Sequence, residues 1–124
     1  MKSILIVEDS AMTRAMIRTA LENIDDCEVE IIEVESGFEA LRILPSREFR
    51  LILTDINMPD INGLELINFV KSNPTYRNIP LIIVTTECRE EDRNRGMALG
   101  AFAYITKPFE PEALQKLVQK ALEE

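Results

Sequence analysis

The sequence predicts a doubly wound α/β fold, in which a five-stranded parallel sheet carries helices on both faces. Short apolar runs alternate five times with segments whose apolar residues recur at helical spacing. The runs are almost continuously apolar, as in parallel strands that are buried on both faces. No linker, repeat or low-complexity segment interrupts the alternation. We therefore expect residues 1–124 to form one domain around one core.

The chain begins with a predicted strand and helix. Residues 3–7 form the strand, and Asp9 or Ser10 can cap the helix that follows. Because both methionines of this helix share its apolar face, we expect them in the core rather than in a binding groove. The apolar face consists of Met12, Met16, Ala20 and Ile24.

A second strand and a short helix come next. Residues 25–27 are a connection, and the strand at 29–34 has interspersed glutamates that suit a partly exposed edge. The short helix starts near Gly37 and is stopped by Pro45. Its apolar residues are Phe38, Leu41 and Leu44.

The middle of the chain holds two further strands, at 51–54 and 80–85. Between them we predict a helix at 64–70 that ends near Asn73 and Pro74. Its inward residues are Leu66, Ile67 and Val70.

The last third is predicted to contain a weak helix and a strong one. Residues 90–99 are mostly charged and include Gly96, so we expect the least stable helix there. A fifth strand at 101–106 follows, and Pro111 then opens the final helix. The apolar stripe of the final helix is Ala113, Leu114, Leu117, Val118, Ala121 and Leu122.

Composition excludes several classes of function. The net charge is −8, with 22 acidic and 14 basic residues and no Lys/Arg run, so we expect no nucleic-acid partner and no membrane partner. The apolar run at residues 4–7 is too short for a signal peptide, which favours a cytoplasmic protein with Cys27 and Cys88 as reduced, inert thiols. The absence of histidine excludes Ser-His-Asp triads, Cys-His pairs and His-ligated zinc. Carboxylate, hydroxyl and lysine chemistry remains, and it points to a hard divalent cation such as Mg²⁺.

Reactive polar groups follow four of the five predicted strands. Ligands of doubly wound folds bind beyond the carboxyl ends of the strands, where the strand order reverses. We therefore expect these groups to converge on one site. They are Glu8-Asp9, Asp55, Thr85-Thr86 and Lys107.

Such a convergence predicts phosphoryl-transfer chemistry. Two carboxylates about 4 Å apart repel by roughly 4 kcal/mol at an effective dielectric of 20, so the acids require a cation. Lys107 supplies one positive charge, and Mg²⁺ would supply two more. Asp55 can then act as a nucleophile toward phosphorus, while the Thr85 hydroxyl orients the phosphoryl oxygens.

These motifs resemble the receiver domains of two-component response regulators along the full chain. The matching segments are VEDS at 7–10, LILTDINMPDINGLEL at 51–66, VTTE at 84–87 and YITKPF at 104–109. The single-domain chemotaxis type is the most similar in length and in Asn57, Glu87 and Tyr104. The resemblance implies a flavodoxin-like (βα)5 fold with strand order 2-1-3-4-5 and a cis Lys107-Pro108 bond.

The resemblance also implies a role for each site residue. Asp55 would be the phosphoacceptor, assisted by Lys107 and Thr85. Mg²⁺, or Mn²⁺ in its place, would be held by Asp9, Asp55 and the backbone carbonyl of Asn57, and by Glu8 through water. Thr85 and Tyr104 would be the switch residues. The other neighbours of the phosphoryl group would be Met58, Thr86 and Glu87.

The implied function is a phosphorylation-controlled binding module rather than a multiple-turnover enzyme. Phosphate would come from a histidine kinase or a small acyl phosphate, and the surface of the fourth helix, fifth strand and fifth helix would then bind an unidentified protein target. A phosphatase is a possible further partner. Asn57 with Glu87 resembles receivers with short-lived phosphoryl groups, so fast self-hydrolysis is expected.

Two residues depart from the common receiver pattern. Glu8 is longer than the Asp often found first in the acidic pair, which can shift a water-mediated contact with the metal. Thr86 replaces a smaller Ala or Gly, and it could narrow access for a phosphodonor or a phosphatase.

Two other functions compete with this interpretation. A haloacid-dehalogenase-like phosphatase also uses Asp, Thr, Lys and Mg²⁺, but it needs a general acid where this chain has Asn57. A flavodoxin-like electron carrier needs a phosphate-binding loop, whereas residues 8–14 carry two acids. Tyr104 has its own alternative, because it could pack in the core on one strand face with Phe102.

Overall fold

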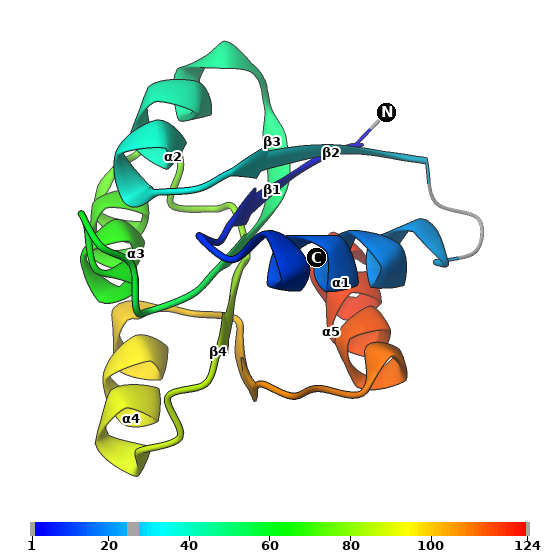
Figure 1. Ribbon diagram of the computed structural model, residues 1–124. Coiled ribbons are helices and arrows are strands. Elements are labelled where there is room, and N and C mark those ends of the chain that lie inside the picture. Colours follow the sequence, from blue (N-terminus) through cyan, green and yellow to red (C-terminus); the bar gives the residue numbers. More distant parts are fainter. Residues whose placement is uncertain (1, 25–27, 124) are drawn as a thin grey trace.

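The computed structural model describes residues 2–24 and 28–123, so the connection expected at 25–27 lies outside it. Five strands and five helices alternate along the chain, with one short 3-10 helix after the second helix (Figure 1). In order, they are β1 (Lys2–Val7), α1 (Ala11–Glu22), β2 (Val29–Val34), α2 (Gly37–Ile43), η1 (Leu44–Ser46), β3 (Phe49–Thr54), α3 (Gly63–Ser72), β4 (Leu81–Thr85), α4 (Glu90–Leu99), β5 (Ala103–Thr106) and α5 (Pro111–Glu123).

The sheet confirms the predicted fold. All strand pairs are parallel, and their order is β2-β1-β3-β4-β5. The helices α1 and α5 lie on one face, and α2, α3 and α4 lie on the other (Figure 1). The order therefore reverses between β1 and β3, and this switch point is where doubly wound folds place their ligands.

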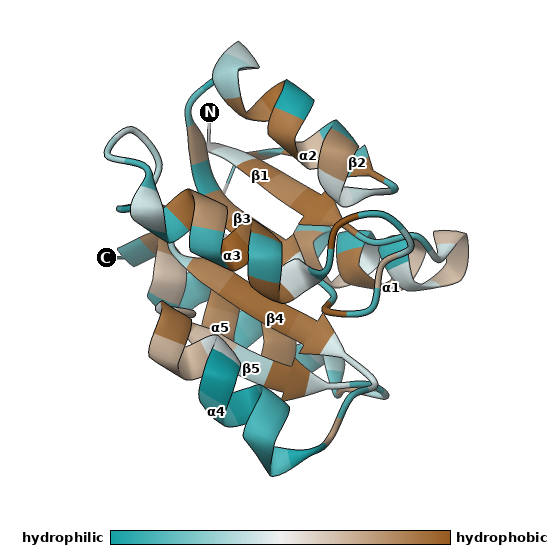
Figure 2. Cartoon of the chain, turned by 90° about the vertical axis from the view of Figure 1, so that its left-hand side faces the viewer, coloured by the Kyte–Doolittle hydropathy of each residue, from teal (hydrophilic) through white to brown (hydrophobic). Residues whose placement is uncertain are grey.

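Alternation along each strand divides the core into two apolar layers. In β1, Leu5 and Val7 face α2, α3 and α4, whereas Ile4 and Ile6 face α1 and α5. Because both faces are covered, the inner strands β1, β3 and β4 are apolar almost throughout, as their colouring in Figure 2 shows. The edge strand β2 is only partly buried and carries Glu30 and Glu33. Within the described part of the chain, no helix is both long enough and apolar enough to cross a bilayer.

The predicted apolar face of the first helix is confirmed at Ala20 and Ile24 and is wrong at its two methionines. Met12 is 75% exposed and Met16 is 46% exposed, while the buried stripe is formed by Ile17, Ala20, Leu21 and Ile24. Burial explains the orientation, because Ile17 and Leu21 are each 1% exposed and pack in the layer of α1 and α5. Arg14 and Arg18 of the same helix form ion pairs with Glu33 of β2, at 3.6 and 2.6 Å.

Other predictions failed on single residues. Tyr104 and Phe102 do not share a face: Phe102 precedes β5 and packs with the layer of α1 and α5, opposite Tyr104. Phe38 and Ala113 are exposed, although each was expected on an apolar face. The predicted strand starts also shift, because β3 begins earlier, at Phe49, and β5 begins later, at Ala103.

Candidate functional site

Three of the predicted residues meet in ion pairs at the carboxyl edge of the sheet. Lys107 follows β5, and its Nζ lies 2.7 Å from Oε1 of Glu8 and 3.0 Å from Oδ2 of Asp55. Glu8 follows β1 and Asp55 follows β3, the two strands at the switch point. Asp9 joins them, because carboxylate oxygens of Glu8, Asp9 and Asp55 lie within 4.8 Å of one another.

Backbone bonds hold Glu8 in place. Its amide donates to the carbonyl of Val34, the last residue of β2, at 3.1 Å, which continues the pairing with β2 one residue beyond the end of β1. Its Oε2 accepts from the amide of Ser10 at 3.0 Å. Arg14, a residue that the sequence analysis did not single out, donates from Nη1 to the carbonyl of Glu8 at 2.7 Å. The turn between β1 and α1 is thus held by bonds to β2 and by bonds to Ser10 and to Arg14 of α1.

Asp55 is held as firmly. Its amide donates to the carbonyl of Val7 at 3.2 Å, and its Oδ1 accepts from the amides of Ile56 and Asn57 at 2.6 and 3.1 Å. Only 5% of the residue is exposed. Gly63 closes the loop, since a Cβ there would lie 2.0 Å from the carbonyl oxygen of Asp55.

The pKa values follow from burial and from this pairing. Burial acts to lower the pKa of Lys107, but its bonds with Glu8 and Asp55 raise the pKa above the usual value. For Glu8, which is 1% exposed, burial raises the pKa against the opposing effect of Lys107. Lys107 is thus a firmly protonated ammonium between two acids.

The donor set fits a hard divalent cation. Three carboxylates converge, but a single ammonium pairs with only two of them, and Asp9 is exposed beside the cluster. Carboxylate oxygens are the ligands that Mg²⁺ and Mn²⁺ prefer. Glu8, Asp9 and Asp55 could therefore bind such an ion.

The two predicted switch residues, Thr85 and Tyr104, both bond to the backbone of Glu87 in the loop between β4 and α4. The Thr85 Oγ1 is buried and accepts from the amide of Glu87 at 3.2 Å. The Tyr104 hydroxyl donates to the carbonyl of the same residue at 2.6 Å, and its ring is buried. Lys107 connects to this region through its amide, which donates to the Thr85 carbonyl at 2.7 Å. The predicted cis bond between Lys107 and Pro108 is confirmed.

The predicted neighbours of the phosphoryl group are distributed over different places. Thr86 lines a cavity of about 410 Å³ together with Asp9, Asp55 and Lys107. Glu87 lines a second cavity, of about 300 Å³, together with Asn57 and with residues of α3 and α4. Met58 packs against the core layer of α2, α3 and α4. The sequence analysis missed other residues that line the first cavity, namely Ser10, Thr13, Met16, Pro108 and Phe109.

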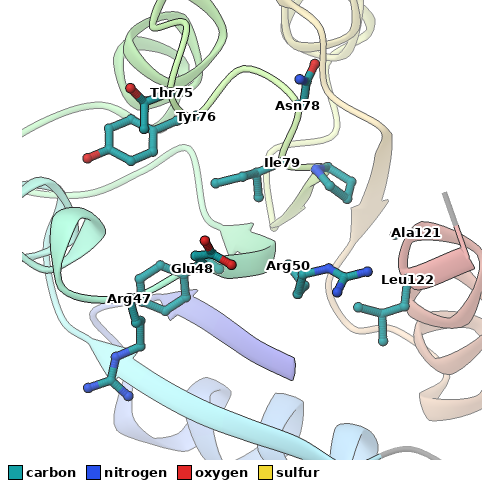
Figure 3. A pocket seen from close by; sticks show the side chains of 11 residues that line it. Arg47, Glu48, Arg50, Thr75, Tyr76, Asn78, Ile79, Ala121 and Leu122 are labelled. Carbon is teal, nitrogen blue, oxygen red and sulfur yellow. The ribbon is translucent and has the colours of Figure 1, made fainter. Parts of the chain in front are cut away.

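Another cavity, of about 350 Å³, lies at the opposite edge of the sheet. It is lined by residues at the start of β3, by the segment before β4 and by the end of α5, and Figure 3 shows these side chains. None of the predicted site residues lines it. The predicted site residues therefore lie at the carboxyl edge of the sheet and not around this cavity.

Comparison with known proteins identifies the family. Residues 4–119 match the family model of the response regulator receiver domain. A chemotaxis protein CheY homolog of Campylobacter jejuni is 35% identical over 120 residues, which is 96% of this chain and 91% of that protein. The chain therefore belongs to the response regulator receiver domains, and it is similar to those of the chemotaxis type.

Solved structures support the same assignment. The chemotaxis response regulator CheY4 of Vibrio cholerae has a TM-score of 0.86 and 34% identity, with 98% of this chain and 99% of that one covered. The Mn²⁺-bound response regulator Rcp1 has a TM-score of 0.83 and 30% identity, with 97% and 91% covered. Phosphorylation-driven switching is the standard function of this family, and receiver domains act as phosphoacceptors for histidine kinases. Nothing in the comparisons supports the haloacid-dehalogenase alternative.

Proposed function

We propose that Asp55 is the phosphoacceptor of this receiver domain. One Asp55 carboxylate oxygen bonds to phosphorus as the bond from phosphorus to the donor breaks, which leaves an acyl phosphate on the protein. The donor is a histidine kinase or a small acyl phosphate. The ion pair of Asp55 with Lys107 carries the proposal, because it places the ammonium beside the oxygen that gains a phosphoryl group.

Asp9, Asp55 and the Asn57 carbonyl are the proposed ligands of Mg²⁺, for which Mn²⁺ can substitute. When bound, the ion neutralises charge on the phosphoryl oxygens. Glu8 is assigned an indirect contact through water. Its two oxygens already accept from Lys107 and from the Ser10 amide, which supports this assignment over a direct one.

Thr85 and Tyr104 are the proposed switch residues. A phosphoryl group on Asp55 accepts from the Thr85 hydroxyl in place of that hydroxyl's contact with Glu87, and Tyr104 shares the same loop. The equilibrium of α4, β5 and α5 shifts in consequence, and this surface binds a protein target. Thr86 borders the cavity and restricts access for the donor and for a phosphatase.

Acetyl phosphate with Mg²⁺ tests the assignment. Wild-type protein should gain one phosphoryl group, and peptide mapping should locate it on Asp55. Asp55→Asn should abolish labelling, because an amide is not a nucleophile toward phosphorus. Glu48→Gln, at the opposite edge of the sheet, is the matched control and should be labelled like wild type. Undiminished labelling of Asp55→Asn would refute the proposal, and multiple turnover on a phosphomonoester would favour a phosphatase.

A further inference from the structure

The loop that joins β3 to α3 is tied to α2, an element that carries none of the proposed site residues. The loop covers residues 55–62, including Asn57, whose carbonyl is a proposed metal ligand. Asp60 lies three residues after Asn57, and its carboxylate bonds to the start of α2. The Asp60 Oδ1 accepts from the amide of Gly37 at 3.1 Å, and its Oδ2 accepts from the amide of Phe38 at 2.9 Å.

These bonds are not the ordinary cap of α2. Ser36 already caps the helix locally, because its Oγ accepts from the amide of Glu39 at 3.2 Å. Asp60 satisfies the two preceding amides from 22 and 23 residues away. The backbone amides hold the pKa of Asp60 down to about 2, so the carboxylate is ionised at neutral pH.

Close packing reinforces the same contact. A Cβ at Gly37 would lie 2.6 Å from the Cβ of Ile61, so the loop touches the helix at a position that only glycine leaves open. At the other end of the loop, Gly63 donates to the carbonyl of Ile56 at 2.8 Å and Asn62 forms a capping box with Glu65. The loop is therefore anchored on both sides of Asp60, and Asp60 is its attachment to α2.

We propose that Asp60 is a positioning residue for the metal site, because its bonds to the start of α2 hold the loop that carries the Asn57 carbonyl. The inference rests on the proposed function, in which that carbonyl is a ligand. Metal sites depend on the groups that orient their ligands, since a displaced ligand binds more weakly even when its chemistry is unchanged. Asp60 acts in this way from a surface position that touches no acid of the cluster.

Calorimetric titration with Mg²⁺ tests the proposal on the full chain. Asp60→Ala should raise the Mg²⁺ dissociation constant roughly three- to tenfold. Removing a group that directly orients a metal ligand usually lowers metal affinity by about tenfold or more, and Asp60 acts less directly, through the loop. Gly37→Ala should raise it as well, because the new Cβ displaces Ile61 without changing any charge. Acetyl phosphate labelling at subsaturating Mg²⁺ should slow in both variants and recover at saturating Mg²⁺.

Ser36→Ala is the matched control. It removes the local cap and destabilises α2, yet it leaves the bonds of Asp60 in place, so its Mg²⁺ dissociation constant should equal that of wild type. Circular dichroism and urea unfolding establish that each variant is folded before titration.

Three results would overturn the proposal. One is an unchanged dissociation constant in folded Asp60→Ala. Another is an equal loss of Mg²⁺ affinity in Ser36→Ala, which would mean that the stability of α2 and not Asp60 itself sets the affinity. The third is that Asp60→Ala no longer weakens Mg²⁺ binding at about 1 M salt, where the Debye length is about 3 Å. Asp60 would then act on the ion through its charge and not through the position of the loop. Failure of wild type to bind Mg²⁺ would instead refute the proposed function.

Discussion

The helices α4 and α5, which flank β5 in sequence, are held to the sheet in different ways. α5 buries Leu114, Val118, Ala121 and Leu122 in the layer that it shares with α1. α4 buries only Asp92 and Gly96, neither of which is a large apolar residue. Figure 2 shows the outcome: the first turns of α4 are hydrophilic, while the apolar strands lie beneath.

The contacts at the start of α4 are polar. Arg89, the residue before the helix, donates from Nε to the carboxylate of Asp92 in the first turn at 3.0 Å, a local bond that orders this end of the helix. The Arg93 guanidinium lies 5.7 Å from the centre of the Tyr104 ring, and the Tyr104 hydroxyl bonds to the Glu87 carbonyl just before the helix. Water can replace such contacts, whereas it cannot replace a buried apolar stripe. The proposed switch at Thr85 and Tyr104 would therefore act on α4, whose displacement costs less free energy than that of α5.

The largest difference should come from truncating the apolar contacts. Leu114→Ala should lower the free energy of unfolding by about 2–5 kcal/mol, because it leaves a cavity at a fully buried position. Met97→Ala, on partly exposed Met97 of α4, should change it by no more than about 0.5 kcal/mol. Urea unfolding measures both. Equal losses in the two variants would break the comparison.

Amide hydrogen exchange should show the next largest difference. The amides of α4 should open with a free energy roughly 1–3 kcal/mol below those of α5, because few buried apolar contacts oppose local opening. Exchange followed by NMR or by mass spectrometry of peptides gives both values. Matching protection in the two helices would show that polar contacts hold α4 as well as burial holds α5.

The smallest of the three effects should be a loss of local stability of α4 at alkaline pH. Burial, then Asp92 and Glu87, raise the pKa of Tyr104 above 10.0. A raised folded-state pKa means that the stabilisation is complete below about pH 10 and is lost as pH rises through the folded pKa. Exchange of α4 amides, corrected for the intrinsic pH dependence, should accelerate there in wild type and less in Tyr104→Phe. The same acceleration in both proteins would exclude Tyr104 as its cause.

Most of the candidate site could be predicted, because the sequence shows where each apolar run, and so each strand, ends. Glu8, Asp55, Thr85 and Lys107 each stand directly beside an apolar run, and parallel strands bring such positions to one edge. The pairing inside the cluster was less accessible. The resemblance implied that Lys107 assists Asp55, whereas in the structure its ammonium lies 2.7 Å from Glu8 and 3.0 Å from Asp55.

Two other contacts between distant segments could not be predicted from the sequence. The attachment of Asp60 to Gly37 and Phe38 joins the β3–α3 loop to the start of α2, and the separation of these segments depends on the whole sheet. The orientation of α1 depends on which of its apolar residues pack against the sheet and α5, and Ile17 and Leu21 do so. Met12 and Met16 fit the helical period as well as Ile17 and Leu21 do, so periodicity alone could not choose between the two faces.

The sequence by itself determined the order of strands and helices, the acids and the lysine at the strand ends, and the contrast between a charged α4 and an apolar α5. These are local properties, set by periodicity, chain breakers and side-chain chemistry. Tertiary structure alone decided which face of α1 is buried, that Lys107 lies between Glu8 and Asp55, and that Asp60 ties the β3–α3 loop to α2. The reason is physical, since such contacts depend on distances across the sheet that no local pattern encodes.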